Sequence, residues 1–247
     1  MKNEKYQVAI VGAGHIFPHH VAAIMQVPGF SVKKDHDRDL DSRSIALKAG
    51  LEFCPHYEEI LNDPKVDVVV VLVPPAHHFE VAHKALLAGK HVLLEKPPTE
   101  TLEQFDALAA LAKEKGRLLI TALHAAFGLE VLGFKPELEI REGGAYHKKY
   151  GRLVGIESEF SDPYIVNHLL VSGSESLGGS WFDGGINALS VIYQIVPEVV
   201  VKEAEFDTSI SSRNCREVKA KVSFGFLGGE GKIITTWKKQ QNSKQTA

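Results

Sequence analysis

The sequence predicts an α/β protein made of a doubly wound parallel sheet followed by a smaller α/β domain. Two observations support this. From residue 6 to about residue 122, short apolar runs alternate with amphipathic segments that end at glycine or proline. Beyond residue 122 the runs become longer and partly alternating, as in antiparallel strands. We therefore expect one domain over residues 1–122 and a second over residues 123–247.

The first domain is expected to alternate between strands and helices, which favours right-handed parallel crossovers. The expected strands are 6–11, 30–32, 66–73, 91–94 and 117–121, and the expected helices are 20–27, 41–49, 57–61, 79–87 and 101–115. The second strand is expected to be interrupted, because the polar run 33–36 stands where an apolar strand should continue.

The second domain is expected to hold a mostly antiparallel sheet and at least two helices. The expected strands are 153–160, 199–206, 219–226 and one beginning within 231–237, and the expected helices are 131–140 and 187–195. The polar residues 238–247 are expected to fray.

Composition excludes several classes of function. The net charge of −3 comes without a basic face, so no nucleic-acid partner is expected. The apolar run Val68–Val73 is too short to cross a membrane, and the first residues lack a signal-peptide pattern, so we expect a cytoplasmic protein. Cys54 and Cys215 are expected to be free thiols. No metal site is expected, because the paired histidines lack acidic neighbours at ligand spacing.

The turn Gly12-Ala13-Gly14 lies between the first strand and the first helix. Glycine permits a tight turn and a close approach by phosphate, and the helix start, with His15 and Ile16, offers free N–H groups. Together with the βαβ pattern this indicates a dinucleotide coenzyme. Phe17 occupies the position of a third glycine, so a plain strand-to-helix turn remains the alternative.

The end of the second strand carries charged residues. Asp37 is expected to bind the adenosine ribose, which favours NAD, whereas Arg38 beside it would suit the extra phosphate of NADP. Solvated surface charges are the alternative explanation. Pro74 and His78 follow the next long strand and are also expected to contact the coenzyme.

Glu95-Lys96-Pro97 follows a further strand, at the edge where open parallel sheets bind ligands. There the Lys96 amine can hydrogen-bond a hydroxyl group that is being oxidised. A surface turn is the alternative. Asp183, just before the predicted helix 187–195, and Asn187 within it can face one site. The alternative for Asp183 is a helix N-cap.

Three stretches of this sequence resemble the Gfo/Idh/MocA oxidoreductase family: VAIVGAGHI, DPKVDVVVVLVPPAHHFEVAHKALLAGKHVLLEKPP and WFDGGINALSVI. The resemblance implies a Rossmann domain that binds NAD or NADP through the glycine turn and Glu95, with Lys96 as a catalytic residue. Asp183 and Asn187 resemble the branch of galactose and arabinose 1-dehydrogenases, and this implies catalytic roles for both. His124, Asp162 and His168 are candidates for contacts with the substrate. The alternatives are a structural histidine for His124 and ordinary loop residues for Asp162 and His168. Family members usually continue with further strands, so the resemblance also implies a truncated second sheet, whose open edges favour a homo-oligomer.

These features favour oxidation of a cyclic aldose at C1 to a lactone. One alternative is a dehydrogenase of an inositol or another polyol. A second is a dinucleotide-binding sensor that retains the fold without turnover.

Overall fold

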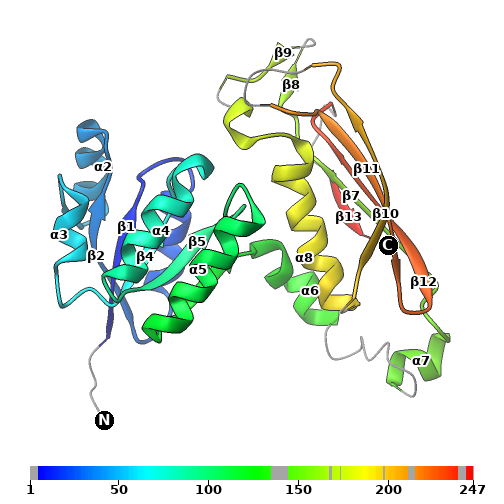
Figure 1. Ribbon diagram of the computed structural model, residues 1–247, viewed down its shortest axis with the longest axis horizontal. Coiled ribbons are helices and arrows are strands. Elements are labelled where there is room, and N and C mark those ends of the chain that lie inside the picture. Colours follow the sequence, from blue (N-terminus) through cyan, green and yellow to red (C-terminus); the bar gives the residue numbers. More distant parts are fainter. Residues whose placement is uncertain are drawn as a thin grey trace. The chain divides into compact units, whose positions relative to one another are not determined.

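The computed structural model describes residues 5–134, 144–166, 169–172, 174–196, 198–210, 215–238 and 243–246. The chain divides into two compact units, Met1–Ala122 and Leu123–Ala247, which are shown in Figure 1. Across the described ranges, we find no helix with the length and apolar character needed to cross a bilayer.

The first unit is built on a six-stranded sheet with the order β3-β2-β1-β4-β5-β6, and every pairing in it is parallel. Its strands are β1 (Tyr6–Val11), β2 (Phe30–His36), β3 (Glu52–Phe53), β4 (Val68–Val71), β5 (His91–Glu95) and β6 (Leu119–Ala122). This confirms the doubly wound sheet. The sequence pattern did not predict β3, which is only two residues long.

Helices cover both faces of this sheet. They are α1 (Phe17–Met25), α2 (Arg43–Lys48), α3 (Tyr57–Leu61), α4 (His78–Leu87) and α5 (Leu102–Lys115), with a 3₁₀ turn at Leu40–Ser42 and another at Pro75–His77. Successive β1 side chains point to opposite faces. Ala9 and Val11 pack in one core with α3, α4 and α5, while Val8 and Ile10 pack in another with α1 and α2. In Figure 1, α4 and α5 lie together over one face.

The expected interruption of β2 is wrong, because the strand continues through His36. A bulge absorbs Lys33: Val8 pairs with Val32, and the next residue, Ala9, pairs with Lys34. The buried His36 ring contacts the carbonyl oxygen of Cys54 through Nδ1 at 2.8 Å and stacks on Tyr57. Polar residues are thus accommodated in this strand by partners from neighbouring elements.

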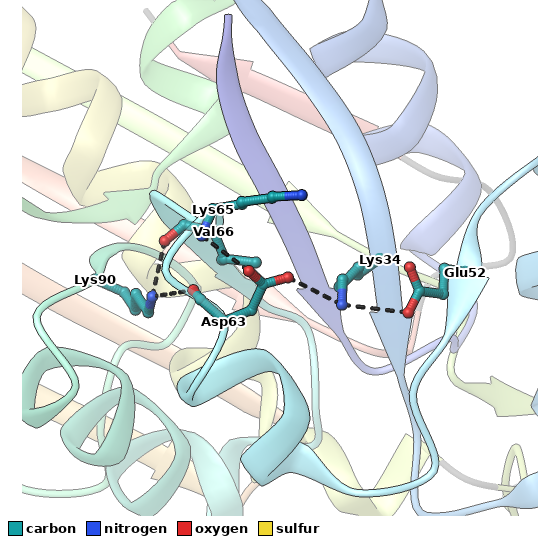
Figure 2. Close-up of polar contacts among 6 residues, drawn as sticks. All are labelled: Lys34, Glu52, Asp63, Lys65, Val66 and Lys90. Carbon is teal, nitrogen blue, oxygen red and sulfur yellow. Dashed lines mark hydrogen bonds and ion pairs between the residues drawn. The ribbon is translucent and has the colours of Figure 1, made fainter.

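A charged network ties the loops that lead into β4 and β5, as Figure 2 shows. Lys34 Nζ lies 3.0 Å from Asp63 Oδ2 and 3.2 Å from Glu52 Oε1. The buried Lys90 ammonium donates to the carbonyl oxygens of Asp63 and Val66 over 2.6 and 2.9 Å. Burial lowers the pKa of Lys90. This network lies where β4 and β5 begin, whereas the glycine turn and the Glu95 turn lie at the opposite, carboxyl ends of their strands.

The second unit contains a five-stranded sheet with the order β10-β11-β12-β7-β13. Its strands are β7 (Gly155–Ser161), β10 (Val200–Asp207), β11 (Lys219–Phe226), β12 (Gly229–Thr236) and β13 (Ser243–Thr246), and β8 (Ile165–Val166) pairs separately with β9 (Leu169–Leu170). The sheet is mixed, because β7 and β12 run parallel while the other pairs are antiparallel. The prediction that the chain frays from residue 238 is wrong for Ser243–Thr246, because these residues form β13, which pairs with β7.

One long helix, α8 (Ile186–Ile195), packs on this sheet (Figure 1). Its Ala188 and Ile192 are fully buried against Ile156, Phe224 and Ile233 of the strands. The other helical segments are α6 (Leu129–Phe134), α7 (Ala145–Tyr150), 3₁₀ turns at His124–Phe127 and Ser174–Leu177, and a π-helical turn at Trp181–Gly185 that runs directly into α8. The predicted helix 131–140 extends partly beyond the described residues.

Candidate functional site

The turn after β1 depends on Gly12. Its φ of 108° lies in the left-handed region, and a Cβ built on it would lie 2.8 Å from the carbonyl carbon of Leu72 and the backbone nitrogen of Val73. The Gly12 N–H donates to the carbonyl oxygen of His36 over 2.8 Å. Only glycine fits this position, so the chain leaves β1 in close contact with the two neighbouring strands.

Gly14 forms the open side of the same turn. No atom lies within 4 Å of a Cβ built on Gly14, and Gly14, His15 and Ile16 are all exposed. The N–H of Phe17, where α1 begins, donates to the carbonyl oxygen of Gly14 over 3.1 Å. An accessible backbone at the start of a helix suits a phosphate group. These residues therefore fit the pyrophosphate of a dinucleotide.

Phe17 accounts for the missing third glycine. Its ring is 1% exposed and lies in the core with Val8, Ile10 and Val21. In the strict motif a third glycine lets the helix pack closely on the strand. Here an aromatic ring fills the space between helix and sheet, and the turn itself is retained.

Asp37 connects the end of β2 to the glycine turn. Its Oδ2 accepts from the Ala13 N–H over 2.7 Å, and its Oδ1 accepts from the Asp39 N–H over 2.8 Å. Each carboxylate oxygen retains a lone pair for a further donor such as a ribose hydroxyl. Arg38 is exposed beside it. The structure thus brings Asp37 to the turn that its predicted role requires.

A histidine of α1, His20, contacts the Glu95-Lys96-Pro97 turn. His20 Nε2 lies 2.8 Å from Glu95 Oε1, and Glu95 Oε2 accepts from the Lys96 N–H over 2.8 Å. Burial alone would raise the pKa of Glu95, but the contacts with His20 and the Lys96 N–H hold it below its ordinary value. The sequence reasoning assigned no role to His20, because its partner lies 75 residues away.

His78, the first residue of α4, contacts the same turn. Its Nδ1 lies 2.7 Å from the carbonyl oxygen of Pro97, and its Nε2 lies 2.8 Å from that of Val73. Burial lowers the pKa of His78, and both carbonyl contacts oppose this. With the side chain 1% exposed, neither ring nitrogen is left for a coenzyme. His78 therefore links the end of β4 to the turn, while Pro74 beside it is exposed.

In the second unit, Asp183 and Asn187 lie where the π-helical turn meets α8. Both are buried, with 7% and 5% exposure, and Asn187 Nδ2 donates to the Asp183 carbonyl oxygen over 3.4 Å. The N-cap of α8 is Gly185, so Asp183 lies inside the π-helical turn and is not the cap of α8. Such turns are frequent at functional sites. Among the described residues, Asn187 Oδ1 has no hydrogen-bond partner.

Tyr164 is a further polar side chain near Asp183 that the sequence reasoning did not single out. Its ring packs edge-on against Trp237 with the centroids 5.4 Å apart. Burial raises the pKa of Tyr164 to about 12, and the carboxylates of Asp183 and Asp162 add to this. A tyrosine two residues after an aspartate belongs to no known motif, so nothing in the neighbouring residues indicates a functional role for Tyr164. Its phenol is placed near both carboxylates.

The predicted site residues form two groups, one in each unit. The first unit holds the glycine turn, Asp37, Arg38, Pro74 and the Lys96 turn, and the second holds His124, Asp162, Asp183 and Asn187. His124 is exposed and begins a 3₁₀ turn. His168 lies outside the described residues. Within the described ranges, no group of three or more His, Cys, Asp or Glu side chains is placed to hold a metal ion.

Comparison with known families identifies the first unit. The family model GFO_IDH_MocA, described as an oxidoreductase family with an NAD-binding Rossmann fold, matches residues 6–123. Residues 6–123 thus match the family model of the Gfo/Idh/MocA oxidoreductases. The model describes an NAD-binding Rossmann fold, which agrees with the glycine turn, and structures with the same fold were solved with NAD and with NADP.

Curated relatives match parts of the chain. YhhX, an uncharacterized oxidoreductase of Escherichia coli (strain K12), is 36% identical over 146 residues, which are 59% of this chain and 35% of YhhX. IolW of Bacillus subtilis (strain 168), a scyllo-inositol 2-dehydrogenase (NADP(+)), is 47% identical over 62 residues, which are 25% of this chain and 17% of IolW. The chain thus spans about a third of YhhX and less of IolW.

Solved structures resemble the chain over both units. GenD2 from gentamicin A biosynthesis, in complex with NAD, has a TM-score of 0.85 at 23% identity and covers 98% of this chain and 68% of its own. D-galactose-1-dehydrogenase from Rhizobium etli has a TM-score of 0.80 at 25% identity and covers 100% of this chain and 76% of its own. The Rossmann sheet followed by a mixed-sheet unit is typical of Gfo/Idh/MocA oxidoreductases.

Proposed function

We propose that this chain is an NAD(P)-dependent dehydrogenase that oxidises a cyclic aldose at C1 to the lactone. The buried pair of Asp183 and Asn187 on the π-helical turn carries the proposal. The unpaired Oδ1 of Asn187 is a buried acceptor, and such atoms in native proteins usually have a donor. A sugar hydroxyl supplies one. The similarity to D-galactose-1-dehydrogenase supports the same class of substrate.

The coenzyme is assigned to residues of the first unit. Gly12, Gly14, His15 and Ile16 hold the pyrophosphate, and Asp37 or Arg38 meets the adenosine ribose. Pro74 and Glu95 line the carboxyl edge of the sheet beside them. When bound, the nicotinamide accepts the hydride from C1.

The remaining chemistry belongs to side chains of the protein. Lys96 Nζ donates a hydrogen bond to the C1 oxygen and stabilises the negative charge that develops there, and the Asp183 carboxylate takes the hydroxyl proton as the C1–H bond breaks. Asn187 orients the ring through its amide. Asp162, His124 and His168 contact other hydroxyls.

The test is formation of reduced coenzyme with a panel of aldoses and polyols. We expect turnover with galactose or arabinose that is lost in Lys96→Ala. Lys113→Ala removes an exposed lysine from α5 and serves as the matched control, which should leave turnover unchanged. Coenzyme binding without turnover of any compound would contradict the proposal and favour a sensor.

A polyol is the second candidate substrate, favoured by the 47% identity with IolW over 62 residues. The catalytic roles of Lys96 and Asp183 stay the same, because an inositol ring carbon, like C1 of a cyclic aldose, carries one hydrogen and one hydroxyl group. Turnover of inositols alone, with none of aldoses, would select this candidate.

A further inference from the structure

Glu217 is a buried carboxylate in the second unit, just before β11. The residue is 6% exposed, and its Oε1 accepts from the Trp181 N–H over 2.8 Å. Its carbonyl oxygen accepts from the Ser180 N–H over 3.1 Å. Both donors lie in the segment that leads to Asp183, so Glu217 contacts that segment through its side chain and its backbone.

Two glycines let the chain wrap around this carboxylate. Gly179 has a φ of 136°, and a Cβ built on it would lie 2.3 Å from Glu217 Oε1 and 2.6 Å from Glu217 Cδ. Gly178 has a φ of 85°, and its carbonyl oxygen accepts from the Arg216 N–H over 3.2 Å. A side chain at Gly179 would collide with the carboxylate, so the two segments fit each other only in this arrangement.

The contact lies at the start of the helical turn that carries Asp183. Trp181 is the first residue of the π-helical turn, and the Asp183 N–H donates to the carbonyl oxygen of Gly179 over 3.0 Å. A carboxylate that accepts a backbone N–H here is favoured by the helix dipole. Hydrogen bonds to charged acceptors are also stronger than neutral ones.

Burying this carboxylate has a cost. Burial raises the pKa of Glu217, and the Trp181 N–H opposes the rise. A neutral residue would avoid that cost, whereas a charged acceptor gives a stronger bond to the turn.

We propose that Glu217 is a positioning residue that holds the 178–183 turn so that Asp183 keeps its place relative to Asn187. The inference rests on the proposed role of Asp183, but the hold on the turn can be measured without any substrate. Glu217 itself touches neither coenzyme nor sugar in this scheme.

The test compares Glu217→Ala with Glu217→Gln in the full chain by amide hydrogen exchange. Alanine removes the acceptor for the Trp181 N–H, and we expect exchange at Trp181–Asp183 to speed up by about 10- to 100-fold. Glutamine keeps a carbonyl acceptor and should restore most of the protection. Exchange in the paired strands β11 and β12 of the second unit should be the same in both variants, which shows that this unit is folded.

Kinetics separate positioning from general destabilisation. With the sugar substrate, Glu217→Ala should lower kcat while leaving KM within about threefold, and Glu217→Gln should recover most of kcat. Unchanged exchange in Glu217→Ala, or equal exchange in the two variants, would overturn the inference. If Glu217→Ala does not fold, Glu217→Asp, which is one methylene shorter, replaces it.

The two proposals fail in different ways. If the wild-type chain turns over no sugar or polyol, the proposed function fails, and the exchange experiment still decides whether Glu217 holds the turn. If turnover is found but Glu217→Ala keeps full kcat, only the inference about Glu217 fails.

Discussion

His20 Nε2 lies 2.8 Å from Glu95 Oε1, which joins the helix after the glycine turn to the residue before Lys96. Glu95 in turn accepts from the Lys96 N–H. The helix start assigned to the coenzyme phosphates and the lysine assigned to catalysis are therefore connected by one carboxylate.

Loss of that connection should reduce turnover. We expect His20→Ala to lower kcat/KM by about 10- to 100-fold, since small displacements of a catalytic group have effects of this size. Steady-state kinetics with the best substrate of the panel measure this. His19→Ala, an exposed histidine one residue earlier in α1, is the matched control. Equal kinetics for the two variants would show that the Glu95 contact does not position Lys96.

His78 should make stability depend on pH in mildly acidic solution. Folding lowers the pKa of His78 from its ordinary value of 6.5, so below about pH 6.5 the unfolded chain takes up a proton that the folded chain does not. The contribution of neutral His78 to the free energy of unfolding is complete above that pH. It decreases as the pH falls toward the lowered pKa of His78 in the folded chain. Urea unfolding at about pH 7.5 and 5.5 should show a smaller loss in His78→Gln than in the wild type. If both proteins lose the same free energy of unfolding between these pH values, His78 is not the source of the pH dependence.

Asp35 should make the protein less stable as the pH rises. The side chain is 0% exposed on β2, opposite Ile10, and neither of its oxygens has a partner among the described residues. Burial, together with the charge of Asp37, raises its pKa to about 7 from an ordinary value of 3.8. The penalty is absent below pH 3.8, grows as the pH rises through this window and is constant above pH 7.

Replacing Asp35 by valine should remove this penalty. We expect Asp35→Val to gain about 2–4 kcal/mol in the free energy of unfolding at pH 8 and much less at pH 5. Thermal unfolding at both pH values measures the difference, with Asp106→Val, which replaces an exposed aspartate of α5, as the control. A variant that is less stable than the wild type at pH 8 would show that the carboxylate has a partner.

Asp37 and Arg38 should set the preference between NAD and NADP. Asp37→Ser removes a negative charge that repels the phosphate of NADP, and we expect the ratio of the Kd values, NADP over NAD, to fall by about tenfold. Arg38→Ala should raise that ratio by a similar factor if the guanidinium binds the phosphate. Calorimetric titration with both coenzymes gives the four constants. Parallel changes in both Kd values would mean that these residues hold only the shared adenosine.

The sequence predicted those parts of the fold whose signals are local. Neighbouring residues alone predict the valine run of β4, the helix Tyr57–Leu61 and the end of α5 before Gly116. The glycine turn, with Gly12 against the end of β4, likewise follows from its position after a strand.

Features that depend on residues far apart in the sequence were not predicted. The polar residues of β2 read as an interruption because Asp63 and Tyr57, which accommodate Lys34 and His36, come from other elements. Glu217 is 36 residues from Trp181 and has no motif around it. His78 was assigned to the coenzyme from its place after a strand, and only the fold shows its ring beneath the Lys96 turn.

The bonds that fix Glu95 and Pro97 come from His20 and His78, and all four residues precede Ala122. Asp183 and Glu217 take part in hydrogen bonds with Gly179, Ser180 and Trp181, which all follow that point. Substitutions around the π-helical turn can therefore accumulate without removing the contacts of His20 and His78 that position the Lys96 turn. Under the proposed function, a lineage can change the substrate contacts of the second unit and inherit the coenzyme contacts of the first.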